Sequence, residues 1–154
     1  MKRFISIVAA LLAFGLAASA QLKVTHEFEK TEKIATARLG FVRLEKSGDR
    51  VYMTLPSSNK FDDTELFWLG KTVHSAAQTL ADIVDLFDTL EEAVKVQDAF
   101  GKDVLISKMG GNLYFHFEIQ AGQRFLSKAE AKKLLNALQV LEWTIDHPEV
   151  TDNP

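Results

Sequence analysis

The sequence contains no cysteine, which excludes disulfide bonds, thiolate metal sites and a lipid-carrying cysteine at a mature N-terminus. Basic residues are also in deficit, because 18 lysines and arginines stand against 21 aspartates and glutamates. Nucleic-acid binding depends largely on neutralising phosphates, so this balance argues against a nucleic-acid partner. At 154 residues and 47% apolar composition, the chain is nevertheless large enough to build a core without covalent cross-links.

Recognised catalytic and cofactor-binding patterns are missing too. The chain has no His-Glu-x-x-His pair, no Gly-x-Ser-x-Gly elbow, no phosphate-binding glycine loop and no calcium loop of the helix-loop-helix type. We therefore expect no cofactor and no metal site, and we assign no catalytic residue. The acidic group Asp62, Asp63 and Glu65 lacks the glycine-spaced pattern of a cation site, which favours a solvated loop.

The N-terminus has the pattern of a signal peptide. Lys2 and Arg3 precede the apolar run 5–18, and the small residues 18–20 come directly before Gln21. The apolar run is shorter than the roughly 20 residues that span a bilayer, so we expect cleavage after Ala20 and no membrane anchor. Residues 1–20 are thus predicted to be a signal peptide of a secreted or periplasmic protein, and residues 21–30 a lead-in or edge strand.

The rest of the chain contains the same pattern twice. Three residues around the first hairpin recur 62 residues later around the second: Lys46, Gly48 and Tyr52 correspond to Lys108, Gly110 and Tyr114. After the hairpins the spacing falls to 57, where Trp68, Leu69 and Lys71 correspond to Phe125, Leu126 and Lys128. The first repeat therefore carries an insertion, which we place in the loop 57–63.

Each repeat is predicted to contain four strands followed by a helix. Glycines with short polar neighbours mark the hairpin turns, and Gly40 marks a bulge or corner in the long first strand. Apolar residues at three- and four-residue spacing predict helices over 71–90 and from Ser127 to His147, the second opening with a Ser127 and Glu130 capping box. Its predicted inward residues include Leu141 and Ile145.

The predicted fold is α+β, with two tandem ββββα repeats, antiparallel sheets and both helices on one side, related by a pseudo-twofold axis. Repeat 1 covers residues 31–91, repeat 2 covers 92–146, and residues 147–154 form a C-terminal tail. No Pro-, Gly- or Ser-rich spacer separates the repeats, so we expect them to share one core.

This order of elements resembles the repeats of the Whirly and PUR-repeat single-strand-binding proteins, in which two β-sheet units carry their helices on one side. The resemblance implies the architecture. Those families bind nucleic acid on basic, aromatic sheet faces, which the export signal and the acidic balance do not match here. No functional residue is therefore transferred from them.

Alternation along the strands predicts a candidate binding face opposite the helices. It comprises two side chains from repeat 1 and three from repeat 2: Tyr52, Thr54, Tyr114, His116 and Glu118. We expect this exported protein to be a non-enzymatic binding or interaction module for an unknown protein or small ligand. The alternatives are an ordinary solvated sheet face, a homodimer interface, and a small hydrolase that uses His116 and Glu118.

Overall fold

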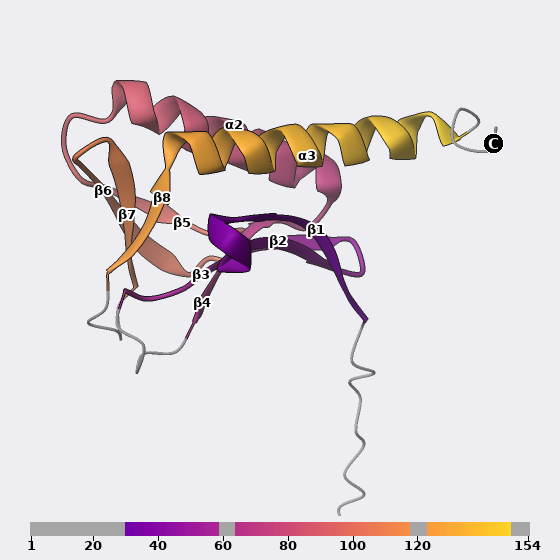
Figure 1. Ribbon diagram of the computed structural model, residues 1–154, viewed down its shortest axis with the longest axis horizontal. Coiled ribbons are helices and arrows are strands. Elements are labelled where there is room, and N and C mark those ends of the chain that lie inside the picture. Colours follow the sequence, from indigo (N-terminus) through magenta and orange to yellow (C-terminus); the bar gives the residue numbers. More distant parts are fainter. Residues whose placement is uncertain (1–29, 59–63, 118–122, 149–154) are drawn as a thin grey trace, which may run out of the picture.

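A computed structural model describes residues 30–58, 64–117 and 123–148. Four strands and a helix occur twice in succession, which confirms the predicted α+β fold of two ββββα units (Figure 1). The predicted signal peptide, the lead-in up to residue 29 and the tail from residue 149 lie outside the described residues.

The first sheet is antiparallel and has the order β1-β2-β3-β4. Its strands are β1 (Thr31–Ala37), β2 (Val42–Ser47), β3 (Arg50–Leu55) and β4 (Glu65–Gly70). Gly48 takes a φ of 58° in the two-residue connection between β2 and β3, as a tight hairpin requires. The predicted corner at Gly40 is a single 3₁₀ turn, η1 (Arg38–Gly40), between β1 and β2.

The second sheet repeats this arrangement with the order β5-β6-β7-β8. Its strands are β5 (Val94–Gln97), β6 (Asp103–Met109), β7 (Asn112–Phe117) and β8 (Arg124–Ser127). Gly110 and Gly111 both have positive φ, of 57° and 81°, which fits a hairpin that needs φ > 0 at both turn positions.

Strand register confirms both spacings of the duplication. Tyr52 lies opposite Trp68 in the first sheet, and Tyr114 lies opposite Phe125 in the second. The tyrosines are 62 residues apart and their partners 57, so the insertion falls between the third and fourth strands of repeat 1.

Both helices begin at well-formed caps. In α2 (Val73–Thr89) the hydroxyl of Thr72 accepts from the backbone N–H of Ser75, and in α3 (Lys128–Asp146) Ser127 accepts from Glu130. The predicted capping box of Ser127 and Glu130 is confirmed, because the Glu130 carboxylate also accepts from the backbone N–H of Ser127 at 2.9 Å.

Helices α2 and α3 run antiparallel to each other on one side of the two sheets (Figure 1). Beneath them the apolar side chains of both repeats form one continuous core. Phe67 of the first sheet packs edge-on against Phe115 of the second, with ring centroids 5.5 Å apart. The repeats therefore bury one another, as the missing spacer predicted.

One core position differs from the prediction, and another differs between the two repeats. Ile145 was predicted to face inward, but it is exposed, because the last turns of α3 extend past the sheets (Figure 1). Arg124 is the largest fully buried side chain and occupies the position that Phe67 takes in repeat 1. Its guanidinium lies 5.9 Å from the ring of Phe117.

Candidate functional site

The predicted binding face begins on β3, where Tyr52 and Thr54 point away from Val51, Met53 and Leu55. Both side chains are nevertheless buried, with only 8% of Tyr52 and 1% of Thr54 exposed. The Thr54 hydroxyl donates to the Glu45 carboxylate at 3.1 Å. Neighbouring side chains therefore cover the centre of this sheet face, and neither residue lies open to solvent.

Aromatic pairs occupy equivalent places on the two sheets. Tyr52 packs against Trp68 with ring centroids 4.8 Å apart, and Tyr114 packs against Phe125 at 5.8 Å. Such cross-strand aromatic pairs stabilise a sheet beyond the area that they bury. The two tyrosines thus each contact an aromatic residue of their own repeat.

Each aromatic pair is covered by a residue from the other repeat. Phe100 packs edge-on against Trp68 with centroids 4.9 Å apart, and the guanidinium of Arg38 lies 3.8 Å from the ring centre of Phe125. Arg38 and Phe100 are themselves 62 residues apart. The reciprocal exchange of covering residues supports the pseudo-twofold relation.

A tight turn fixes Phe100 in place. The Asp98 Oδ1 atom accepts hydrogen bonds from the backbone N–H groups of Phe100 and Lys102, both at 2.9 Å. Ala99, which follows Asp98 in the turn, donates its backbone N–H to the carbonyl of Trp68 at 2.9 Å. The turn is therefore held both by its own aspartate and by the edge of the first sheet.

Two cations flank the exposed ring of Phe100. The Lys71 Nζ atom lies 5.6 Å from the ring centre and the Arg50 guanidinium carbon 5.9 Å from it. Phe100 is 49% exposed, and both cationic residues are on the surface. We call Trp68, Phe100, Arg50 and Lys71 the Phe100 platform: a fixed aromatic surface with positive charge at its edge.

The position in repeat 2 that corresponds to the Phe100 platform is covered by Arg38. Arg38 donates to both carboxylate oxygens of Glu130, at 2.9 and 2.7 Å, and to the carbonyl of Phe125 at 2.9 Å. Burial by itself raises the pKa of Glu130, but the hydrogen bonds from Arg38 and Ser127 outweigh it and hold this pKa below its ordinary value. The guanidinium is thus committed to a structural ion pair.

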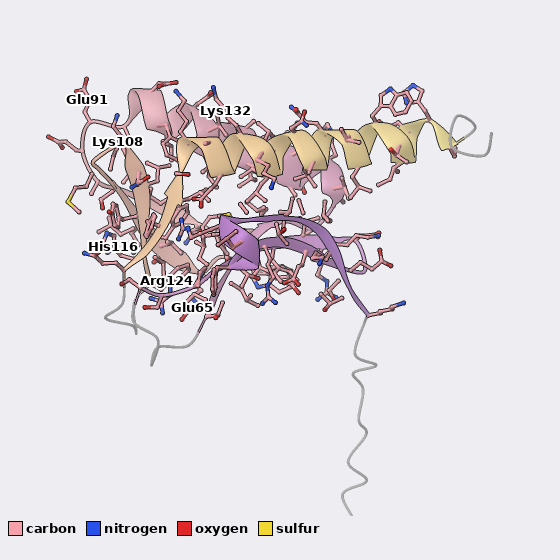
Figure 2. All side chains as sticks on the ribbon, viewed as in Figure 1. Glu65, Glu91, Lys108, His116, Arg124 and Lys132 are labelled. Carbon is pink, nitrogen blue, oxygen red and sulfur yellow. The ribbon has the colours of Figure 1, made fainter. Side chains whose placement is uncertain are left out.

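His116 lies on β7, exposed and remote from the two helices (Figure 2). Its Nε2 atom and the Ser107 Oγ atom are hydrogen-bonded at 2.9 Å. The ring borders a depression of about 340 Å³ that Lys95, Asp103 and Leu105 also line. Glu118, the predicted acidic partner of His116, lies outside the described residues.

The carboxylate beside this depression is already engaged. Asp103 accepts from Gln97 at 3.0 Å and pairs with Lys95, and the hydrogen bonds from Lys95 and Gln97 lower its pKa. A serine-histidine pair needs an oriented and activated imidazole for nucleophilic catalysis. Among the described residues, His116 is hydrogen-bonded to Ser107, whereas the nearby Asp103 carboxylate is bonded to Gln97 and Lys95.

Other polar groups form ion pairs between the two repeats. Glu65 accepts from Lys102 at 2.7 Å, while Asp62 and Asp63 lie outside the described residues. His74 contacts Gln78 at 3.1 Å and pairs with Glu142 across the two helices. In the part of the chain that the structure describes, no three His, Asp or Glu side chains converge as a metal site would require.

Neither described helix combines the length and the apolar character that crossing a bilayer requires.

Sequence reasoning missed Phe100, Asp98 and Arg38 as determinants of the site. Part of the signal was present, because the spacing of 62 relates Arg38 to Phe100 just as it relates the two tyrosines.

Comparisons with protein-family models, with curated proteins and with solved structures find no match for this chain.

Proposed function

We propose that this protein is an exported, non-enzymatic binding module that holds its partner on the sheet surface around the Phe100 platform. The proposal includes the signal peptide and cleavage after Ala20. The observation that carries it is a half-exposed aromatic ring fixed between Trp68 and two cations. Rigid aromatic residues and arginines contribute most of the affinity of typical binding surfaces.

The fixed position of the ring favours binding. The turn that carries Phe100 has its hydrogen bonds provided by Asp98 and by the backbone of β4, so little conformational entropy is lost when a partner docks. Tyr114 and His116 remain part of the proposed surface on the second sheet. Tyr52 and Thr54 support it from beneath.

The test compares two exposed apolar residues. Wild-type protein, Phe100→Ala and Met109→Ala would be immobilised and exposed to envelope extract and culture fluid, and bound proteins and small molecules identified by mass spectrometry. Met109 is similarly exposed but lies at the second hairpin, so it is a matched control. We expect the same partner on wild-type protein and Met109→Ala, and at least about a tenfold loss on Phe100→Ala, as for an interface hot spot.

Equal recovery on all three proteins, or no partner on the wild type, would reject the platform as a binding surface.

The second candidate function is a hydrolase, favoured by the Ser107 and His116 hydrogen bond. Ester or amide hydrolysis that Ser107→Ala abolishes and Phe100→Ala leaves intact would support that alternative.

A further inference from the structure

A groove with both apolar and polar lining residues adjoins the Phe100 platform. It has a volume of about 420 Å³ and lies where the end of β4, the start of α2 and the turn after β5 meet. Its polar lining residues include Ser75, Thr79, Gln97 and Asp98. Lys71 lines the groove and also flanks Phe100, so the groove and the platform are continuous.

One carboxylate oxygen of Asp98 is left without a partner among the described residues. The residue is only 5% exposed, and its Oδ1 atom accepts two backbone hydrogen bonds. Its Oδ2 atom is buried and has no hydrogen-bond partner in the described part of the chain. Leaving a buried polar atom unsatisfied costs free energy, so a ligand hydroxyl that donates to Asp98 would gain more than it would on the open surface.

The platform adds two further requirements. An exposed phenyl face fits a ring with an apolar side, and Lys71 and Arg50 beside it favour an anionic substituent. The adjoining groove is lined by Ser75, Thr79, Gln97 and Asp98, residue types whose oxygen atoms can accept hydrogen bonds from ring hydroxyls. A hydroxylated ring that carries one acidic group provides an apolar face for Phe100, an anionic group for Lys71 and Arg50, and hydroxyl donors for the groove.

We infer that the groove and the Phe100 platform together bind a monosaccharide unit that carries a carboxylate, such as a uronic acid within an acidic polysaccharide. This inference rests on the proposed binding function and specifies its ligand. The ring stacks on Phe100, the carboxylate contacts Lys71 and Arg50, and ring hydroxyls donate to the acceptors of the groove. A single negative charge suits the site better than a phosphate dianion, because Asp98 lies in the wall and the chain has a net charge of −3.

Trp68 provides the readout. The chain has 2 tryptophans, so Trp143→Phe leaves Trp68 as the only indole, in contact with Phe100. In that background, Trp68 fluorescence would be followed during titration with glucuronate, glucose and adenosine monophosphate, up to about 10 mM of each, which covers the weak affinity of single sugar units. We expect saturation with glucuronate and at least about tenfold weaker binding of glucose, a difference of about 1.4 kcal/mol.

Three variants in the same background test the assigned roles. Asp98→Asn keeps an Oδ1 acceptor for the turn but replaces Oδ2 with a donor, and we expect it to weaken glucuronate binding about tenfold. Lys71→Gln should remove most of the preference for glucuronate over glucose. Lys132→Gln removes a cation from the exposed surface of α3 and should leave binding unchanged.

Several results would overturn the inference. They are no saturable binding of glucuronate, equal affinity for glucose, tighter binding of the nucleotide, or unchanged affinity in both Asp98→Asn and Lys71→Gln. If glucuronate fails while Phe100→Ala still abolishes capture of a partner from extract, the ligand class is wrong and the binding function stands. If Phe100→Ala changes neither measurement, both proposals fail.

Discussion

At the scale of single residues, the corner between β1 and β2 shows how a strained backbone is held. Arg38, Leu39 and Gly40 all have positive φ, of 47°, 55° and 91°, and the Leu39 side chain is 100% exposed. A non-glycine residue in this region costs about 1–2 kcal/mol. The ion pair of Arg38 with Glu130 and its contact with Phe125 offset that cost.

The pH dependence of stability should report this ion pair. The pKa of Glu130 is lowered in the folded protein, so its contribution to stability is present above its unfolded pKa of about 4.3 and is lost as the pH falls through the folded pKa. We therefore expect the wild type to lose more stability than Glu130→Gln between about pH 5 and pH 3. Urea unfolding at a series of pH values measures the difference.

Glu130→Gln is a suitable comparison because glutamine also completes a capping box. Hydrogen bonds to Lys128 and Lys95 lower the pKa values of Asp88 and Asp103 in both proteins. Their pH-dependent contributions to stability therefore cancel when the two proteins are compared. Parallel stability curves for the two proteins across this range would show that the charge of Glu130 does not stabilise the fold.

At the scale of elements, the junction between β4 and α2 depends on a close approach. A Cβ atom on Gly70 would lie 2.4 Å from the backbone nitrogen of Ala76 and 2.5 Å from the Ser75 Oγ atom. Real side chains do not tolerate such distances, so glycine permits the helix to start against the end of the strand. This junction also forms part of the groove beside the Phe100 platform.

Gly70→Ala should destabilise the protein by about 3 kcal/mol or more, because the backbone of α2 has to move away from β4. Gly101→Ala is the matched control. Gly101 has a positive φ of 84°, which Gly70 does not, but no atom of the described residues lies within 4 Å of the added carbon, so only the backbone strain of about 1–2 kcal/mol is expected. Chemical denaturation of both variants measures the two effects, and equal losses would contradict the steric explanation.

At the scale of the whole molecule, the two repeats depend on each other. The turn after β5 bonds to Trp68 of the first sheet, and the turn after β1 bonds to Phe125 of the second. The buried side chains of both units form one cluster. Neither repeat therefore has a complete core of its own.

We expect a single cooperative unfolding transition that includes both repeats. In Trp143→Phe, the fluorescence of Trp68 reports on the first repeat, and hydrogen exchange of β6 and β7 reports on the second. The two midpoints in urea should agree with each other and with the loss of helical circular dichroism. Separate midpoints would show that the repeats are independent domains.

Local sequence patterns are sufficient to predict the secondary structure, the duplication and the shared core. Alternation, helical spacing, turn glycines and capping residues act over a few positions, so a single chain reveals them directly. The shift in spacing from 62 to 57 also located the insertion, which the registers of Tyr52 with Trp68 and Tyr114 with Phe125 confirm.

The accessibility of these residues depends on the tertiary packing. Alternation places Tyr52 and Thr54 opposite the core, yet both are buried, and Ile145 fits the inner stripe of α3 yet lies beyond the sheets. Phe100 contacts Trp68 across 32 positions of sequence, and Asp98 lines a groove with the start of α2. Burial and convergence of this kind depend on how two sheets and two helices pack together, which local patterns do not encode.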